Sequence, residues 1–459
     1  MPDSIQPRRL ARGWRARLAA AALLPVVVLA AGCTGSSHPT ARTAKASGAA
    51  TPAGVVSDCL IPFPGSCYAP RLFRVAYGIQ PLLDKGIDGR GETVTVLAAA
   101  PPPNAPGPAA SAGALPSGPL AATTDIRSDL TAFDAEFGLP AARIQVVTGL
   151  DGAAAGGQAT GQEVQAAEIV HAVAPAAALR VVLLPADVLG SAATATAAML
   201  AGVRRAVTGT DVAAVSFSLG EHYFSRAQVT QLHATLMGAS AHHVTVVAGT
   251  GDSGAFSDDW FGGPPVKEVS LPAADPLVLA VGGTTLNADP ANGAYLSETT
   301  WNGQGGVVVS KGASAGGFSH LYARPAYQDG VAGTTSMRGV PDVAGDAFPD
   351  GPAVVLVSGG KRWIAPATGT GAAAALWAGV MALADQDARH DLGFVNPAIY
   401  RIARGSGYHQ ALHDVTTGTN VQDQLYPAVT AGYRAGAGWD PVTGWGSPDA
   451  QALVSRLAG

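Results

Sequence analysis

Charged residues are scarce in this chain of 459 residues. Asp, Glu, Lys and Arg make up 13% of it, and the formal net charge is −5. An average globular chain carries about 25% charged residues. Proteins that bind nucleic acid through its phosphates need clustered basic surface, so this composition argues against nucleic acid as a partner. The hydrophobic fraction of 47% is large enough to bury a sizeable core.

Cysteine is also rare, with three residues, Cys33, Cys59 and Cys67. The last two lie close together in DCLIPFPGSCYAP. A structural zinc site needs four ligands, and no third or fourth ligand lies near this pair. In an exported chain such a pair most simply forms a disulfide that closes a small loop.

The N-terminus carries an apolar run, LAAAALLPVVVLAA (18–31), behind a cluster of arginines. It is shorter than the roughly 20 apolar residues of a typical membrane-spanning helix. A basic region followed by such a run and by small residues is typical of an export signal. The run ends in LAAGC, which resembles a bacterial lipobox and indicates that Cys33 is the lipidated first residue of the mature protein. An ordinary signal peptide with a chance cysteine is the alternative.

The expected signal peptide spans residues 1–32, and residues 33–57 are rich in Ser, Thr, Ala, Gly and Pro. Such a segment, without apolar periodicity, is typical of a flexible tether. We therefore expect an extracellular protein, held by lipid on the outer face of the bacterial cell membrane, or else secreted.

Short valine-rich runs alternate with helical patterns in the remainder of the chain. The runs are continuously apolar, as in strands of a parallel sheet that is buried on both faces. This alternation predicts an α/β fold with a largely parallel twisted sheet and helices on both faces. No second tether interrupts it, so we expect one domain over residues 58–459. The predicted strands are 92–100, 143–149, 179–185, 212–220, 244–251 and 276–286, and the predicted helices are 126–138, 161–175, 193–207, 226–241 and 372–385.

Several turn motifs then match one family in order along the chain. They are GDSGA (251–255), LPAADPLVLAVGGTTL (271–286), GGFSHLYARPAYQ (316–328), RGVPDVAGDA (338–347) and AGAGWDPVTGWGSP (435–448). In this order the chain resembles the sedolisins, which are serine-carboxyl peptidases with a subtilisin-like fold. The resemblance covers residues 59–458 and implies that fold and a serine-type endopeptidase ancestry. Family members usually carry a long pro-domain, whereas the stretch between Cys33 and Cys59 is too short for one, so none is expected.

The resemblance also implies a catalytic set. A Ser at a Gly-Thr-Ser turn attacks the peptide carbonyl, and a Glu acts as its general base. An Asp four residues after the Glu orients it, and a second Asp helps to hold the oxyanion. Here the turn reads GTG and places Gly371 at the nucleophile position. Asp252, in GDSGA, matches the oxyanion Asp.

The acid pair is missing as well. Counting back from Pro175 without a gap puts Gln162 at the Glu position and Ala166 at the Asp position. Glu163 is a weaker substitute, because a shift of one residue turns a helical side chain by about 100°. Its partner four residues on would be Ala167. His171 on the same helix is interpreted as a packed histidine, since no hydroxyl at position 371 needs a base.

These losses predict a pseudo-peptidase that binds a peptide or protein ligand through the old cleft. An active serine endopeptidase working at acidic pH with a non-standard catalytic set is the alternative. A structural lipoprotein whose groove has no role is a third hypothesis. We expect a monomer.

The C-terminal motifs resemble the calcium site of the family. An Asp, the next residue's carbonyl, two Gly carbonyls and a later Asp correspond to Asp414, Val415, Gly436, Gly438 and Asp440. Calcium binds six or more oxygen ligands from carboxylates and carbonyls, which these residues offer. The resemblance therefore implies one Ca²⁺ ion; a glycine-rich turn capped by an Asp is the alternative.

Overall fold

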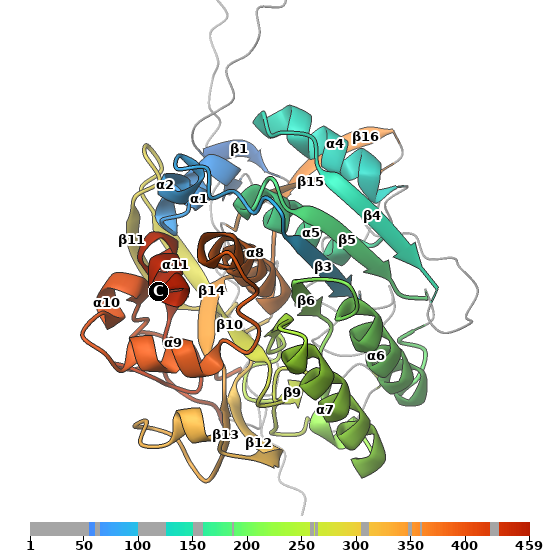
Figure 1. Cartoon of the computed structure of the whole chain (residues 1–459), viewed down its shortest axis with the longest axis vertical. Coiled ribbons are helices and arrows are strands. Elements are labelled where there is room, and N and C mark those ends of the chain that lie inside the picture. The colour runs from blue at the N-terminus through green and yellow to red at the C-terminus, as the bar shows by residue number, and fades with distance from the viewer. Residues whose placement is uncertain are drawn as a thin grey trace, which may run out of the picture. The chain divides into compact units, whose positions relative to one another are not determined.

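The apolar runs of the sequence form a twisted central sheet in the computed structural model (Figure 1). The structure describes residues 55–59, 65–99, 125–149, 159–185, 188–257, 261, 265–303, 312–347, 351–358, 360–422 and 431–459. The expected signal peptide, residues 1–32, and Cys33 lie outside this part of the chain.

The sheet has eight strands, and most neighbours run parallel. The strand order is β11-β10-β8-β6-β3-β5-β4, with β14 paired to β10, and only the β10–β11 pair in this sheet is antiparallel. This confirms the predicted α/β class. The strands are β3 (Thr93–Ala98), β4 (Arg143–Thr148), β5 (Ala178–Leu183), β6 (Val212–Ser216), β8 (Thr245–Gly249), β10 (Leu279–Ala288), β11 (Tyr295–Thr300) and β14 (Val343–Asp346).

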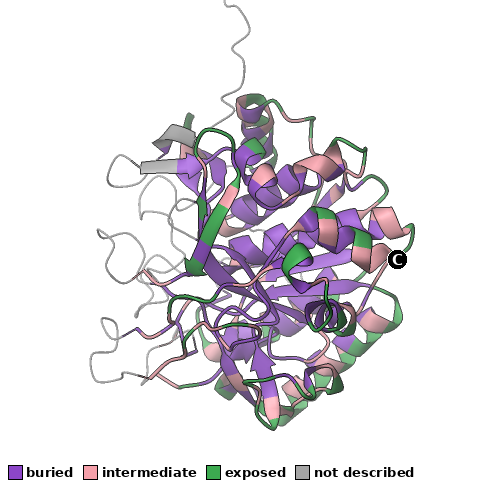
Figure 2. Cartoon of the chain, turned by 90° about the vertical axis from the view of Figure 1, so that its left-hand side faces the viewer, coloured by how far each residue is buried: buried purple, intermediate pink, exposed green. Residues whose placement is uncertain are grey.

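The continuous apolar runs have a direct cause, because successive strand residues enter two different cores. Val212 and Ala214 of β6 belong to one apolar cluster, and Ala213 and Val215 to the other. The first cluster includes helices α5 (Gly161–Val173) and α8 (Thr370–Ala388), and the second includes α6 (Ala192–Ala206) and α7 (Arg226–Ala241). Figure 2 shows the strands as mostly buried and the outer helix faces as exposed.

Further elements surround this sandwich. The remaining helices are α1 (Pro70–Ala76), α2 (Gln80–Leu83), α4 (Ile126–Phe137), α9 (Asn396–Ala403), α10 (Tyr408–Ala411) and α11 (Ala450–Ala458). Antiparallel pairs join β1 (Val55–Cys59) to β2 (Gly65–Tyr68), β12 (Gly317–Ala323) to β13 (Met337–Val340), β15 (Ala353–Ser358) to β16 (Lys361–Pro366), β7 (Leu219–Gly220) to β9 (Ser270–Leu271) and β17 (Leu412–His413) to β18 (Ser447–Pro448). None of the helices in the described ranges combines the length and apolarity needed to cross a membrane.

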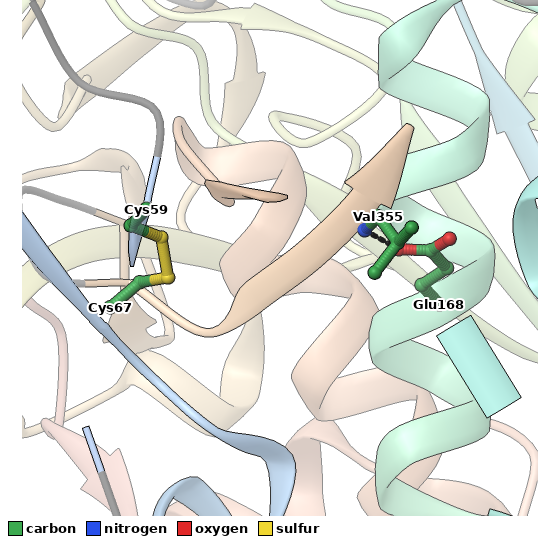
Figure 3. The surroundings of a disulfide bond; sticks show 4 residues. All are labelled: Cys59, Cys67, Glu168 and Val355. Carbon is green, nitrogen blue, oxygen red and sulfur yellow. Dashed lines mark hydrogen bonds between the residues drawn. A yellow bond between two sulfur atoms is a disulfide. The ribbon is translucent and has the colours of Figure 1, made fainter. Parts of the chain in front are cut away.

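One predicted boundary is wrong. Strand β1 begins at Val55, which pairs with Tyr68, so the folded unit starts inside the segment 33–57 that was expected to be a tether. Pairing with β2 supplies the backbone hydrogen bonds that composition alone does not reveal. A disulfide joins Cys59 and Cys67, whose Cα atoms are 6.0 Å apart, and thereby ties the end of β1 to β2 (Figure 3).

Candidate functional site

The turn before helix α8 is built around a glycine that no other residue replaces easily. Gly369 has a φ of 84°, in the left-handed region that glycine tolerates. A Cβ at this position would lie 2.6 Å from the Asp252 Oδ2 atom. The turn therefore combines a special backbone conformation with close approach of a carboxylate.

Asp252 bonds directly to the start of this helix. Its Oδ1 atom accepts hydrogen bonds from the Thr370 N–H at 2.9 Å and from the Thr370 hydroxyl at 3.0 Å. The Thr370 hydroxyl in turn accepts from the Gly251 N–H at 3.0 Å. A carboxylate beside unpaired helical N–H groups is stabilised by the helix dipole. The structure thus brings the residue predicted to hold the oxyanion to the predicted nucleophile turn, where it also acts as a helix cap.

The space beside the Gly371 Cα atom is filled by the side chain of Ser216, at the end of strand β6. The Ser216 hydroxyl donates a hydrogen bond to the Gly371 carbonyl oxygen at 3.2 Å. A Cβ on Gly371 would lie 2.9 Å from both the Cβ and the Oγ of Ser216. Sequence reasoning missed Ser216. The available signal was a polar residue ending a buried strand, since carboxyl ends of parallel strands are where sites form in α/β sheets.

Helix α5, which carries the two acid-pair positions, is fastened to the same turn by Gln165. The Gln165 amide donates to the Thr368 carbonyl oxygen at 2.7 Å and accepts from the Thr368 N–H at 2.8 Å. Gln162 lies in the first turn of α5 and is partly exposed, and its amide oxygen is 3.5 Å from the Gln165 amide nitrogen. Ala166 is fully buried in the apolar core. The acid-pair positions are therefore near the turn without a carboxylate at either of them.

Glu163 is engaged elsewhere. Its Oε2 atom accepts a hydrogen bond from the Thr160 N–H at 2.9 Å and another from the Thr160 hydroxyl, which makes it part of a capping box at the start of α5. Burial raises the pKa of Glu163 to about 7, against the opposing effect of these hydrogen bonds. This arrangement gives Glu163 a local structural role.

Two further polar residues of α5 also have partners away from the turn. The Glu168 carboxylate accepts a hydrogen bond from the Val355 N–H of β15 at 2.7 Å (Figure 3). Burial is the main cause that raises the pKa of Glu168. The His171 Nε2 atom lies 2.9 Å from the Pro140 carbonyl oxygen and 3.0 Å from the Asp134 carboxylate. Both contacts agree with His171 as a packed histidine.

The residues predicted to bind calcium come together in the C-terminal loops. The Asp414 Oδ2 atom accepts from the Gly438 N–H at 2.9 Å, and the Asp440 Oδ2 atom accepts from the Gly436 N–H at 3.0 Å. The Thr443 hydroxyl oxygen lies 3.2 Å from the Val415 carbonyl oxygen and 3.0 Å from the Asp440 Oδ2 atom. It therefore links the backbone at Val415 to the Asp440 side chain.

One carboxylate oxygen in this cluster is buried. The Asp414 Oδ1 atom is buried and forms no hydrogen bond within the described part of the chain. Burial also raises the pKa of Asp440 to about 6. Asp440 is buried and Asp414 is partly exposed. Carboxylate oxygens are a ligand type that calcium prefers, so the chemistry of these side chains fits such an ion.

Comparison with known proteins relates this chain to a family of peptidases. The sequence model of Peptidase_S8, the subtilase family, matches residues 150–401. Kumamolisin from Bacillus sp. (strain MN-32) is 35% identical over 254 residues, which are 54% of this chain and 42% of kumamolisin. Sedolisin from Pseudomonas sp. (strain 101) is 34% identical over 221 residues, 48% of this chain and 36% of that protein. Tripeptidyl-peptidase 1 of Homo sapiens is 31% identical over 53% of this chain and 42% of that protein. Each match thus spans less than half of the relative's length.

A solved structure agrees with the fold. The structure of Pseudomonas sedolisin, a serine-carboxyl proteinase complexed with two molecules of pseudo-iodotyrostatin, superimposes with a TM-score of 0.66 at 24% identity. The superposition covers 85% of this chain and 97% of that one. It confirms the expected subtilisin-like architecture. From its sequence, supported by this fold, the chain belongs to the subtilase family and, within it, to the sedolisins.

Proposed function

We propose that this chain is a sedolisin homologue that binds peptide or protein segments at the turn around Gly371 without cleaving them. The observation that carries this proposal is the contact between Gly371 and Ser216. Glycine at the nucleophile position supplies no hydroxyl, and the space beside its Cα is already filled by the Ser216 side chain. The turn is therefore better suited to binding the carbonyl group of a peptide than to attacking that group with a hydroxyl nucleophile.

The remaining groups suit recognition of a peptide backbone. The Gly371 N–H belongs to the first helical turn, where N–H groups have no partner within the helix. With the helix dipole it can donate to a carbonyl oxygen. In an active peptidase such donors stabilise the oxyanion, and they contribute to binding even when the nucleophile is lost.

The missing base supports the same conclusion. General-base catalysis needs a carboxylate or imidazole within hydrogen-bond reach of the attacking hydroxyl. Gln162 and Ala166 offer neither, and Glu163 is bonded to Thr160. Asp252, the carboxylate that contacts the turn, is bonded to Thr370.

Ser216 favours a second candidate function, a peptidase with a displaced nucleophile. Its hydroxyl ends strand β6 at the turn, and Ser216 is partly exposed. In the present geometry the hydroxyl hydrogen is directed to the Gly371 carbonyl oxygen, so a base would have to displace that bond. We therefore rank cleavage by Ser216 below binding.

Calcium would act structurally in this proposal. Asp414, Val415, Gly436, Gly438 and Asp440 would hold one ion, which would fix the C-terminal loops to each other. An ion that binds only the folded state adds stability by mass action.

The cellular setting is part of the same proposal. The basic and apolar N-terminus with its LAAGC ending supports export and lipid attachment at Cys33. A monomer held at the outer face of the membrane would present the turn around Gly371 to peptides outside the cell. Mass spectrometry of the membrane-extracted protein tests this, with a diacylated Cys33 at the N-terminus as the expected result.

An activity and binding experiment tests the central proposal. The purified protein is incubated at pH 3–5 with a library of internally quenched peptides, and the same peptides are then screened for binding. We expect binding without turnover. Turnover that disappears in the Asp252→Ala variant would overturn the proposal, whereas a groove that retains no peptide would favour a purely structural role.

A further inference from the structure

A hollow lined by arginines opens at the amino ends of strands β4, β5 and β3, which are neighbours in the sheet (Figure 1). Its volume of about 600 Å³ is typical of small-molecule sites, which measure roughly 300–1,000 Å³. The arginines are Arg143, Arg180 and Arg205. The turn with Gly371 contacts Ser216 at the carboxyl end of β6, which runs parallel to β3. The hollow therefore lies at the other end of the sheet from the candidate site.

The hollow lies where helix α6 ends over the sheet. Side chains at alternate strand positions point to one face of a sheet, and along this face Val147, Val182 and Leu97 pack in the apolar cluster that includes α6. The helix ends at Ala206. The first two rows of cross-strand partners on the same face are Arg143–Ala178–Thr93 and Gln145–Arg180–Thr95. Polar side chains thus replace apolar ones at the starts of the strands.

Arg180 is the buried arginine of this set and is only 6% exposed. Its Nη1 atom donates hydrogen bonds to the carbonyl oxygens of Thr208 at 2.8 Å and Arg205 at 3.1 Å, and to the Thr95 hydroxyl at 3.4 Å. Carbonyl groups at a helix C-terminus have no partner within the helix and attract cations. These bonds orient the guanidinium but use only one of its nitrogens. Its Nε and Nη2 atoms, which also carry N–H donors, form no hydrogen bond within the described part of the chain.

The three arginines have no carboxylate partner among the described residues, where the arginine ion pairs involve other side chains. Burial, followed by the charge of Arg205, lowers the pKa of Arg180. The Asp211 carboxylate accepts from the Thr93 N–H at 2.7 Å, but Asp211 does not line the hollow. A buried guanidinium without an anion is unfavourable, because neutral acceptors replace its lost hydration only in part. An anionic ligand would supply the missing charge.

We propose that this hollow binds a soluble small molecule through a phosphate group, which Arg180 contacts from the buried side and Arg143 and Arg205 contact from the exposed side. The planar guanidinium matches phosphate oxygens and can donate two hydrogen bonds at once. Several arginines around one group favour a phosphate, with about 1.5 to 2 negative charges at neutral pH, over a single carboxylate. A Cβ at Gly209 would meet no atom within 4 Å, so this side of the hollow has room for the rest of the molecule.

The ligand would join segments that are far apart in the sequence. Arg143 begins the edge strand β4, Arg180 lies in β5, and Arg205 lies in the last turn of α6. A phosphate between these side chains would replace repulsion of like charges by attraction. Since only the folded chain brings the arginines together, the ligand would also stabilise the fold by mass action. This binding does not depend on the peptide binding proposed for the turn around Gly371.

Calorimetric titration of the purified full-length protein with inorganic pyrophosphate tests the proposal, because this probe offers phosphate without an organic body. The buffers are matched in ionic strength with chloride, and citrate is titrated separately as an anion that carries only carboxylates. We expect pyrophosphate to bind and citrate to bind about tenfold more weakly, a difference that titration resolves readily. Absence of pyrophosphate binding, or a preference for citrate, would refute the phosphate site.

Two adjacent arginines at the end of α6 provide a matched pair of variants. Arg205→Gln removes a charge that lines the hollow and should weaken pyrophosphate binding about tenfold. Arg204→Gln removes the same charge one residue away, outside the lining of the hollow. It should change the affinity by less than about twofold, since salt screens exposed charges outside the site. Equal losses in the two variants would indicate non-specific attraction and overturn the proposal.

Arg180→Lys tests the buried group, because lysine keeps the charge but loses the planar fork. The variant should also bind pyrophosphate about tenfold more weakly, with the wild-type circular dichroism spectrum as evidence of folding. If it does not fold, the comparison of Arg205→Gln with Arg204→Gln decides.

Lipid headgroups are the other source of phosphate, so the protein is also sedimented with phosphatidylcholine vesicles that contain phosphatidic acid. We expect Arg205→Gln to leave vesicle binding unchanged. Vesicle binding that requires Arg205, without binding of pyrophosphate, would overturn the soluble ligand.

Discussion

The Ser216 hydroxyl donates a hydrogen bond to the carbonyl oxygen of Gly371 across 3.2 Å and so links the end of β6 to the first turn of α8. The contact depends on glycine, because a Cβ at position 371 would come within 2.9 Å of the Ser216 side chain. The surroundings of the turn are therefore packed closely around a glycine and leave no room for a side chain at position 371. Restoring a serine at this position involves more than adding a hydroxyl group.

The first prediction concerns that restoration. We expect Gly371→Ser alone to leave peptidase activity absent, because Gln162 and Ala166 provide no base. It should also destabilise the fold by about 1–3 kcal/mol, the usual cost of overpacking a buried contact. Urea unfolding of the variant measures this cost. Adding Ser216→Gly should recover most of it, and a Gly371→Ser variant that cleaves peptides would show that a base exists nearby.

The second prediction concerns Ser216 as a nucleophile. A fluorophosphonate probe should fail to label the protein, because the Ser216 hydroxyl donates to the Gly371 carbonyl oxygen and forms no hydrogen bond to a carboxylate or imidazole among the described residues. Intact-mass spectrometry after incubation at acidic and neutral pH checks this. Ser216→Ala is the matched control, and labelling that it eliminates would favour the peptidase alternative.

The third prediction concerns the connection between α5 and the turn. Gln165→Leu should destabilise the protein by about 2–5 kcal/mol, because it leaves the buried N–H and carbonyl groups of Thr368 without their partners. It should also weaken peptide binding, since Thr368 leads into the turn. Gln162→Leu, at a partly exposed position in the same helix, should cost much less. Equal losses in the two variants would contradict the proposed role of Gln165.

The fourth prediction concerns pH. Burial raises the pKa of Glu163 to about 7 in the folded protein, from an ordinary value near 4.5. The unfolded chain therefore ionises first, so the stabilisation is complete below about pH 4.5 and is lost as the pH rises to about 7. The change attributable to this residue is on the order of 3 kcal/mol.

Glu163→Gln tests this assignment, because it keeps an oxygen acceptor for Thr160 and removes the titration. Unfolding free energies measured between pH 4 and pH 8 should then show a shallower decline than in the wild type. Glu136→Gln, on helix α4, is the control and should retain the wild-type slope. A Glu163→Gln profile that follows the wild type throughout would assign the pH dependence to other groups.

The fifth prediction concerns the C-terminal loops. If Asp414 and Asp440 bind calcium, chelation should lower the melting temperature, and calcium at 100 times its dissociation constant should stabilise the fold by about 2.7 kcal/mol. Asp414→Asn should remove most of that response. Calorimetric scans with and without calcium check this. An Asp414→Asn variant with the full calcium response would exclude these loops as a site.

The sequence by itself determined the class of the fold. Valine-rich runs such as 92–100 and 212–220 correspond to buried strands, because a parallel sheet covered on both faces needs apolar side chains at every position. The long helices that flank the sheet were also predictable; α7 occupies the expected residues 226–241, beginning after the capping residue Ser225. Shorter helices such as α1, α9 and α11 were not predicted. The absence of a hydroxyl at position 371 is likewise a property of the sequence.

Other features depended on contacts between distant segments. The sequence places Ser216 and Gly371 far apart, and only the packing of α8 on β6 shows that one fills the space beside the other. The sequence does not show what Glu163 contacts, whereas in the fold its carboxylate accepts a hydrogen bond from the Thr160 N–H. Glu92, Asp211 and Asp391 likewise share no local spacing pattern, yet their carboxylate oxygens lie within 4.8 Å of one another in the fold. Short-range propensities specify elements, whereas the neighbours of a side chain, and hence its chemistry, are set by tertiary packing.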